Sequence, residues 1–477
     1  MSRYTAITPE DLDAMLAAIG VGSLQEIFER QIPEPVRLGR ELDLPEGLPE
    51  QDVYEHLRAL AARNTSAEDE LSFLGAGMYD HYVPALIDML MERSEFLTPY
   101  TPYQPEISQG GLQVMFEYQT AICELTGLPV SNASVYEGPS AVAAAAYLAK
   151  LHNGARRIVA SAGLHPHTLQ TLRTTAHGFG MEVVEVPLLA GSAGGLTDLD
   201  AWTAAIAADG GGDTSAAIFA QPNFYGAVED AAALSAAAKA AGGESGSGGH
   251  RPVVIAQVDP ITLGILAPPG ECGVDVAVGE GQSLGNRLDF GGPSFGLFAA
   301  REEYLRRMPG RIAGETVDVD GRRGFVLTLQ TREQHIRREK ATSNICTSQA
   351  LNALAGVVYL SWLGRRGIVE LGELLLARTH YARERLAESD GVEKLHEQPA
   401  IREFALRLDA DVAAVKRRCA EHGVNPGVDV HELSGREEDR GVLLVAITER
   451  RTRADIDRLA DVLGAAIALE RQATVTV

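Results

Sequence analysis

Two short stretches of this sequence concentrate side chains that could bind or transfer chemical groups. The first contains Tyr100 and Tyr103, which stand among Pro99, Pro102 and Pro105. Prolines at this spacing exclude a regular helix and force turns or extended backbone, so we expect the two tyrosines on a stiff loop. The second is a polar string whose hydroxyl and amide groups suit a phosphate or a carboxylate, namely Ser343, Asn344, Cys346 and Thr347.

A third candidate is the acidic residue Asp259, which follows the apolar run 253–258 and precedes Pro260. We expect that run to be a buried strand that places the carboxylate at its end. Lysine, whose amine can become a nucleophile when its pKa is lowered, is rare in this chain. The lysines stand at positions 150, 239, 340, 394 and 416, so none lies between 239 and 340.

Composition limits the kinds of partner that the chain can have. Its formal net charge is −23 at pH 7, which repels nucleic acids and anionic membranes. Its cysteines, at positions 123, 272, 346 and 419, lack the paired spacing of a disulfide framework or zinc site, so a reducing compartment is expected. No leader peptide and no apolar run of membrane-spanning length is seen. The sequence therefore predicts a cytoplasmic protein.

Helix and strand patterns alternate along the chain. A first helix is expected to begin at Pro9, with Thr8 as its capping residue. Between residues 110 and 300 apolar strands alternate with helices, which is typical of a mostly parallel sheet with helices on both faces. We expect strands at 157–161, 183–186, 216–220 and 253–258, and helices at 112–126 and 141–151.

The C-terminal third continues the alternation in shorter pieces. Helices are expected at 349–363 and 369–389, followed by strand and helix pieces at 403–408, 410–421, 442–447 and 453–469. The glycine-rich segments 209–212 and 242–249 are expected to be loops. The fold class is therefore α/β. We expect a helical N-terminal arm over 1–70, a large α/β domain over 71–345 and a smaller α/β domain over 346–477.

Four strings give the chain a resemblance to a known family. They are 72–82, 98–113, 132–145 and, most of all, 330–347. They resemble the glycine-decarboxylating P-protein of the glycine cleavage system, which is a fold-type-I enzyme dependent on pyridoxal phosphate. The likeness extends over nearly the whole chain. Some organisms split this P-protein into two polypeptides, and the chain is similar to subunit 1, the N-terminal half-type.

The resemblance implies a reaction and a set of partners. Glycine loses its carboxylate as CO2, and its aminomethyl group passes to the lipoyl arm of the H-protein, with pyridoxal phosphate as the electron sink. The cofactor is carried by a second subunit, in a heterodimer or an α2β2 assembly. The T-protein and the L-protein of the same system are indirect partners.

The lysine that carries the cofactor in fold-type-I enzymes is missing from its expected place. The resemblance puts it downstream of Asp259, where the catalytic half of the family has a His-Lys-Thr string. This chain has Gln282, Ser283 and Leu284 there. Serine has no nitrogen and arginine stays protonated, so neither can replace the lysine. We therefore expect no covalently bound cofactor, with Ser283 at the lysine position. Asp259 then either caps a turn or still faces a pyridinium.

Other positions of the implied cofactor site also depart from the family pattern. Segment 132–140 matches the turn before the helix that binds the cofactor phosphate. Glu137 adds negative charge there and Pro139 removes an N–H donor, which disfavours a phosphate; the alternative is an ordinary strand-to-helix turn. The pair His165 and His167 falls near the ring-stacking histidine of such enzymes, with a packed or exposed role as the alternative. Segment 221–226 is expected to be a strand-end turn.

Fold-type-I active sites lie at a subunit boundary, where the neighbour donates residues. The resemblance therefore implies that this chain completes its partner's site with Tyr100, Tyr103, Ser343, Asn344, Cys346 and Thr347. Arg337 and Arg338 could supply positive charge to the H-protein or to the cofactor phosphate. The alternative for Thr342 or Ser343 is capping of the helix expected at 349–363.

Three functions are compatible with these residues. The chain is a subunit of a decarboxylase that is inactive alone, or it is a self-sufficient enzyme that uses Lys340, or it is a scaffold or regulator of the catalytic subunit. Lys340 follows Arg337 and Arg338, whose charges could lower its pKa. The alternative is that Lys340 is a charged surface residue.

Overall fold

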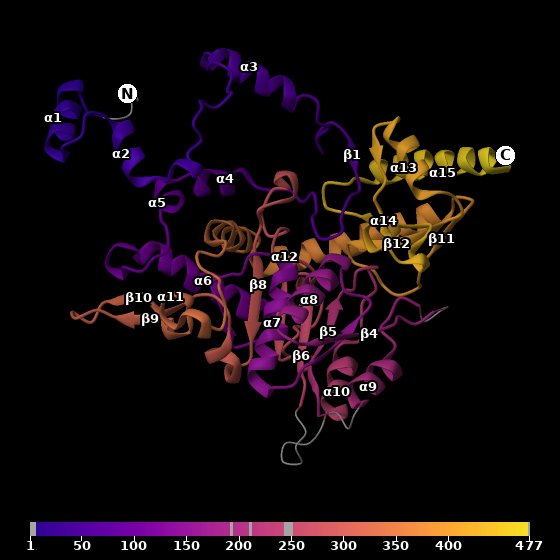
Figure 1. The fold of residues 1–477 in the computed structure, drawn as a ribbon. Coiled ribbons are helices and arrows are strands. Elements are labelled where there is room, and N and C mark those ends of the chain that lie inside the picture. The colour runs from indigo at the N-terminus through magenta and orange to yellow at the C-terminus, as the bar shows by residue number, and fades with distance from the viewer. Residues whose placement is uncertain (1–5, 191–193, 209–211, 243–250, 476–477) are drawn as a thin grey trace. The chain divides into compact units, whose positions relative to one another are not determined.

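The computed structural model describes residues 6–190, 194–208, 212–242 and 251–475 (Figure 1). The chain falls into two compact units that divide after Thr65. None of the described helices has both the length and the apolar character that a bilayer-crossing segment needs. The segments 209–212 and 242–249, which we expected to be loops, lie almost entirely outside the described residues.

The N-terminal unit is a set of helices with little core. Helix α1 (Pro9–Ile19) begins as predicted, because Thr8 accepts the backbone N–H of Asp11 while the Asp11 carboxylate accepts that of Thr8. Two further helices follow, α2 (Leu24–Gln31) and α3 (Glu50–Ala61). The buried hydrophobic residues described in this unit are Leu16 and Val21. Side-chain caps therefore support α1 and α2, whereas α3 has none, and the described residues of the unit form little core.

The second unit is built on a seven-stranded sheet with the order β2-β8-β7-β6-β5-β3-β4. Its strands are β2 (Val130–Ser131), β3 (Arg157–Ser161), β4 (Glu182–Val186), β5 (Thr214–Gln221), β6 (Val253–Val258), β7 (Val276–Glu280) and β8 (Gly296–Ala300). The pairs from β7 to β4 are parallel, and β8 runs antiparallel to both β7 and β2. The predicted α/β fold with a mostly parallel sheet is confirmed.

Helices cover both faces of this sheet (Figure 1). One face packs against α7 (Gly138–Asn153) and α8 (Pro166–Gly178), and Ile158 points into that core. Its neighbour Val159 points into the opposite core, because successive residues of a strand face opposite sides. That core contains residues of α6 (Gln109–Thr126), α9 (Leu199–Ala207), α10 (Ala231–Ala241) and α12 (Ala350–Ala387).

A second sheet of four antiparallel strands forms near the C-terminus. It consists of β11 (Val392–Lys394), β12 (Glu403–Leu408), β15 (Val442–Ala446) and β14 (Val428–Asp429), in that order. It packs on α13 (Val412–Ala420), α15 (Arg453–Val475) and the end of α12; the short helix α14 (Val430–Ser434) follows β14. Helix α12 contains a non-helical residue, Gly364, between the two helices that the sequence predicted.

Strand β1 (Leu71–Ser72) pairs in parallel with β13 (Val424–Asn425). This pairing ties the start of the second unit to its C-terminal part. The segment that follows β1 therefore runs beside residues that come more than 300 positions later, such as Glu403, which binds the N–H of Ala76.

Several elements were not predicted individually, and the largest of them is a hairpin. β9 (Ile312–Val317) and β10 (Arg323–Thr328) form an antiparallel hairpin, which the sequence signals by the Asp320-Gly321 turn and the alternating residues on both sides. The short helices α4 (Ala85–Met91), α5 (Ser94–Leu97) and α11 (Gln334–Arg337) were not predicted either.

Segment 221–226 is a strand-end turn, as predicted, and it makes a testable contact. Gly226 has a φ of 88°, and a Cβ there would lie 2.8 Å from the carbonyl carbon of Glu403 and 2.9 Å from the Cα of Phe404. We expect Gly226→Ala to lower the free energy of unfolding by about 3 kcal/mol, since it combines backbone strain with a backbone clash. Chemical denaturation measures this.

Gly154→Ala is the matched control for that substitution. Gly154 also has a left-handed φ, 78°, but open space surrounds its Cβ position. This variant should lose only the strain, about 1 kcal/mol. Equal losses in the two variants would contradict a close approach between the strand-end turn and β12.

Candidate functional site

A cavity of about 90 Å³ lies at the carboxyl ends of β5, β6 and β7. In open α/β sheets this edge is where ligands bind. The residues that line it include Tyr79, His165, Asp259, Glu280, Ser283, Arg402 and Glu403. Small-molecule sites commonly have roughly 300–1,000 Å³. The cavity is therefore at the place of a cofactor site but is small for one.

The carboxylate of Asp259 is already paired with other residues of this chain. Its Oδ2 lies 2.5 Å from Nη2 of Arg402, and its Oδ1 accepts the backbone N–H of Ile261 at 3.1 Å. The guanidinium of Arg402 also stacks on the ring of Tyr79, at 3.4 Å from the centroid. The predicted turn-capping role of Asp259 is thus confirmed. The ion pair with Arg402 was not foreseen.

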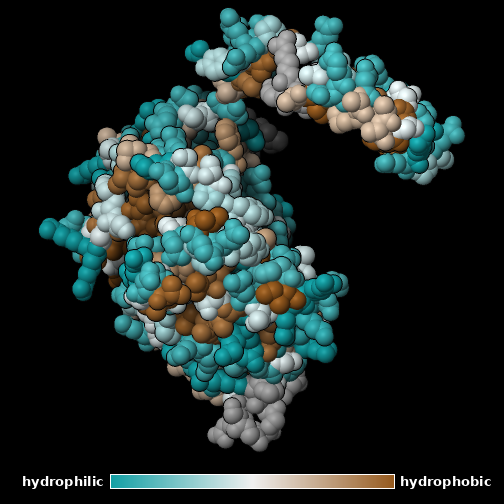
Figure 2. All heavy atoms as spheres, turned by 90° about the vertical axis from the view of Figure 1, so that its left-hand side faces the viewer, coloured by the Kyte–Doolittle hydropathy of each residue, from teal (hydrophilic) through white to brown (hydrophobic). Residues whose placement is uncertain are grey.

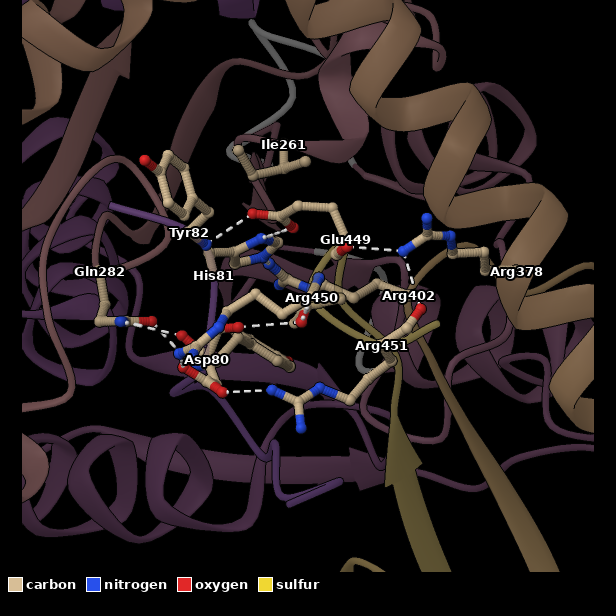
Figure 3. A network of polar contacts seen from close by, with 12 residues as sticks. Asp80, His81, Tyr82, Ile261, Gln282, Arg378, Arg402, Glu449, Arg450 and Arg451 are labelled. Carbon is tan, nitrogen blue, oxygen red and sulfur yellow. Dashed lines mark hydrogen bonds and ion pairs between the residues drawn. The ribbon is translucent and has the colours of Figure 1, made fainter. Parts of the chain in front are cut away.

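The same arginine extends the network into the C-terminal part of the unit (Figure 3). Nη1 of Arg402 lies 2.9 Å from Nε2 of His81, and Nδ1 of His81 lies 2.6 Å from Glu449. Because a guanidinium can only donate, Nε2 accepts and the Nδ1–H donates to Glu449. Glu449 also accepts the backbone N–H of Tyr82 at 2.6 Å. The charge of Glu449 is therefore fully engaged.

Neighbouring contacts tie residues 79–82 down further (Figure 3). Asp80 pairs with Arg451 at 2.7 Å and also with Arg450. The side chain of Gln282 bonds both the N–H and the carbonyl of Tyr79, at 2.9 and 3.1 Å. The buried side chain of Gln282 therefore holds Tyr79 in place where it lines the cavity.

Glu403 is buried beside this network. Its carboxylate accepts the N–H of Ala76 at 2.7 Å and the hydroxyl of Tyr79 at 2.8 Å. Burial raises the pKa of Glu403 to about 7, although both of these hydrogen bonds and the charge of Arg402 favour the ionised form.

The N-terminus of α7 is occupied by two carboxylates. Glu137 caps the helix and accepts the N–H of Ser140 at 3.0 Å, and Glu280 accepts the N–H of Gly138 at 2.9 Å. Pro139, between them, has no N–H. The amides that would bind a phosphate are therefore already satisfied. The sequence indicated Glu137 and Pro139 but not Glu280, which comes from the end of β7.

His165 is a packed histidine in this structure. Its Nε2 lies 2.9 Å from the carbonyl of Ala76, and its Nδ1 accepts the N–H of His167 at 3.0 Å. Its ring meets Phe224 edge to face, with centroids 4.9 Å apart. Burial lowers the pKa of His165 to about 4, so the ring is neutral at pH 7. This confirms a packed role for His165.

The residues at this cavity do not fit covalently held pyridoxal phosphate. Ser283, which follows β7 and is 3% exposed, offers no amine. The amides of α7 are taken by carboxylates, and Asp259 is paired with Arg402. Covalently held pyridoxal phosphate needs an amine, free backbone amides and a free carboxylate, and these lining residues provide none of the three.

A second polar centre lies around Arg311, which precedes β9. Its Nη2 donates to the hydroxyl of Tyr103 at 2.9 Å, its Nε donates to the carbonyl of Cys346 at 2.8 Å, and its Nη1 pairs with Glu333. Tyr100, Thr347 and Arg311 line an adjoining pocket of about 550 Å³. The structure thus brings Tyr100, Tyr103, Cys346 and Thr347 together.

The other predicted residues are less central. Ser343 accepts the N–H of Gly310 at 3.4 Å, and Asn344 is exposed. Arg337, Arg338 and Lys340 are also exposed. Capping of the long helix by Thr342 or Ser343 is wrong, because α12 begins only at Ala350 with Gln349 as its N-cap.

Sequence reasoning missed the charged residues that organise both centres, namely Arg311, Glu333, Arg402, Glu403 and Glu449. Glu333 lies inside the string 330–347, but no local pattern separates it from a surface acid. Glu403 is the first residue of β12 and Arg402 precedes it, but the partner of Arg402 is 143 positions away in the sequence. Tertiary contacts alone connect them.

Comparisons with known proteins agree over almost the full length. The model of the family described as "Glycine cleavage system P-protein" matches residues 2–463. A protein of Carboxydothermus hydrogenoformans named probable glycine dehydrogenase (decarboxylating) subunit 1 is 46% identical over 97% of this chain and 99% of its own. One of the same name from Moorella thermoacetica is 47% identical over 96% of this chain and 98% of its own.

Solved structures give the same result. The crystal structure of a glycine decarboxylase (P-protein) of the glycine cleavage system, in inhibitor-bound form, is 40% identical with a TM-score of 0.85, over 98% of this chain and all of that one. A glutamate decarboxylase of Lactobacillus brevis, 14% identical over 92% of this chain and 97% of its own, has a TM-score of 0.66 and shares the fold.

The buried Glu403 predicts a pH dependence of stability. Since its pKa rises from 4.5 unfolded to about 7 folded, the folded state holds an extra proton between these values, and the free energy of unfolding falls as pH rises through that window. We expect Glu403→Gln to remove up to about 3 kcal/mol of this decline. Urea denaturation from pH 5 to pH 8 measures it.

The exposed Glu388 provides the control. Glu388→Gln also removes one carboxylate of this chain, but its side chain is 69% exposed. It should keep the wild-type dependence on pH. If Glu403→Gln kept that dependence too, Glu403 would not be the group that binds the proton.

Proposed function

This chain belongs to the glycine cleavage system P-protein family, as subunit 1, and from that premise we propose that it is the subunit of glycine decarboxylase that holds no cofactor of its own. The observation that carries the proposal is the small cavity at the sheet edge, where the groups that a cofactor would use are already paired within this chain. Ser283 takes the place of the lysine, and pyridoxal phosphate is carried by the partner, subunit 2. Alone, the chain is inactive.

The work of this chain in the reaction is to complete the partner's site. When bound to the partner, the cofactor supplies the electron sink for decarboxylation. This chain then contributes Tyr100, Tyr103, Ser343, Asn344, Cys346 and Thr347. Hydroxyl and amide donors of this kind orient a carboxylate or a phosphate. The gathering of four of these six residues around Arg311 and one pocket supports a common role.

A partner subunit also needs a surface to pack on. The face of the chain in Figure 2, which carries hydrophobic patches, is the side on which Figure 1 labels α4, α5 and α6. Large hydrophobic residues that are exposed in these segments and in neighbouring ones include Met89, Leu97, Ile107 and Trp362. Exposed apolar patches of this kind mark interaction surfaces. This supports subunit 2 as the direct partner, in a heterodimer or an α2β2 assembly.

The complete assembly then passes the aminomethyl group to the lipoyl H-protein, with the T-protein and L-protein as later partners. Arg337 and Arg338 are exposed and offer positive charge to a docking protein.

The main alternative is a self-sufficient enzyme that uses Lys340. Lys340 is exposed at the end of a short 3-10 turn, Arg338–Lys340, and is not part of the lining of the sheet-edge cavity. Burial, which lowers the pKa of a lysine most strongly, is therefore absent at Lys340. This placement favours a surface role.

Mixing the purified chain with pyridoxal phosphate tests the proposal. We expect no borohydride-trapped adduct and no absorption band near ~420 nm beyond those that Lys340→Ala also gives. The reason is that the described residues lining the cavity include no lysine. Turnover of glycine by this chain alone, lost in Lys340→Ala, would contradict the proposal.

Substitutions in the reconstituted complex separate a boundary role from pure scaffolding. We expect Tyr100→Phe, Tyr103→Phe and Asn344→Ala each to lower the rate of glycine–bicarbonate exchange, because each variant loses one hydrogen bond at the reacting groups. The larger of the two tyrosine effects should be roughly 10-fold. Assembly, measured by gel filtration, should be unchanged. Unchanged exchange in all three variants would leave only the scaffold function.

A further inference from the structure

We propose that Arg311 is a positioning residue that fixes Tyr103 as a hydrogen-bond donor towards the partner subunit. This inference rests on the boundary role proposed above. The acceptor is an anionic oxygen, of a carboxylate or a phosphate, in the shared active site.

The guanidinium of Arg311 joins three segments that are distant in sequence. Its nitrogens bind the hydroxyl of Tyr103 at 2.9 Å, the carbonyl of Cys346 at 2.8 Å and the carboxylate of Glu333. The Arg311 side chain is only 2% exposed. A planar fork that is saturated in this way holds its partners in a fixed geometry. It therefore ties the proline-rich loop to the polar string.

The direction of the hydrogen bond to Tyr103 determines what the tyrosine can do. A guanidinium donates and cannot accept, so the oxygen of Tyr103 is the acceptor of this bond. The hydroxyl hydrogen of Tyr103 is then available to another acceptor. Among the described residues no acceptor for it is found, and Tyr103 is 43% exposed. The free hydrogen is therefore directed to a group outside this chain.

Further contacts hold the ring of Tyr103 in place. Arg311 lies over it at 4.8 Å from the centroid, and His335 meets it edge to face at 5.2 Å. Nδ1 of His335 lies 3.4 Å from the same carboxylate oxygen of Glu333 that pairs with Arg311. The four residues thus close a ring of contacts. Loss of Arg311 would leave Glu333 buried without its main counter-charge.

Cys346 provides a reporter of this geometry inside the chain. Its Sγ lies 3.9 Å from Nη2 of Arg311. Burial opposes ionisation, yet hydrogen bonds with Thr347, Arg311 and Tyr100 keep the pKa of the Cys346 thiol below its ordinary value. The reaction rate of this thiol therefore depends on whether Arg311 is in place.

The first measurement uses the full chain without a partner. The rate of Cys346 with a disulfide reagent is followed against pH in the wild type and in Arg311→Lys, with Cys346→Ser to identify its phase. We expect Arg311→Lys to move the midpoint upward by about half a pH unit or more, because a lysine cannot reproduce the fork. An unchanged profile would overturn the positioning role.

Arg383→Lys is the matched control for that measurement. Arg383 is also a buried arginine that donates to a backbone carbonyl, that of Gln398, but it lies on α12 away from the cluster. It should lose stability without moving the Cys346 profile. A similar shift in both variants would mean that general loosening explains the effect, and the proposal would fail.

The second measurement is a double-mutant cycle in the reconstituted complex, with Tyr103→Phe, Arg311→Lys and both together. If Arg311 acts through Tyr103, each single change lowers kcat for exchange by roughly 10-fold, and the double variant is no worse than the poorer single one. Losses that multiply would overturn the inference.

The two measurements distinguish the possible failures. If Tyr103→Phe leaves exchange unchanged while Arg311→Lys still shifts the thiol profile, the boundary role is wrong and the donation to a partner is wrong with it. If the profile does not move while Tyr103→Phe still lowers exchange, the proposed function stands and Arg311 is not the residue that positions the cluster.

Discussion

A buried guanidinium must be neutralised where it lies, and in this chain that requirement shapes the edge of the main sheet. Arg402 is 5% exposed and meets Asp259 at 2.5 Å, the ring of Tyr79 at 3.4 Å and His81 at 2.9 Å. Removing one member of such a set leaves an uncompensated charge, which costs more than the pair contributes. The segment after β1, the end of β6 and the start of β12 are therefore bound to one another.

The two polar centres use charge in opposite ways. At the sheet edge, carboxylates take the amides of α7, and an arginine takes Asp259, so the groups that a cofactor would use are satisfied inside the chain. Around Arg311, the buried pair with Glu333 satisfies the arginine but leaves the hydroxyl hydrogen of Tyr103 and the thiol of Cys346 available. We call the sheet edge the closed centre, because its polar groups are paired within the chain, and the site around Arg311 the open centre, because it keeps polar groups available.

Much of the fold was predictable because it depends on local patterns. The apolar runs at 157–161 and 253–258 are β3 and β6 to the residue, and Gly364 breaks α12 where two helices were expected. The sequence also singled out Tyr100, Tyr103, Cys346 and Thr347 as candidates, because proline spacing and polar strings are visible in one dimension, and the structure places these four residues near one another.

The charged residues that connect those candidates were not predictable in the same way. Arg311 and Tyr103 are 208 positions apart, and Arg402 and His81 are 321 apart. Nothing near either arginine in the sequence identifies its partner, because a buried ion pair is defined by tertiary contact alone. The hairpin β9–β10 differs, because its Asp320-Gly321 turn is a local signal in the sequence.

The proposed retention of a cofactor-enzyme fold without its lysine is explained by what the two centres share. Tyr103 and Cys346 reach their places only because Arg311 stands at the start of the hairpin that packs on α6, and α6 in turn packs on the main sheet. A chain that lost the sheet would lose this scaffold. At the sheet edge, Asp259 and Arg402 compensate one another, which avoids an uncompensated buried charge. The closed centre therefore maintains the structure on which the open one depends.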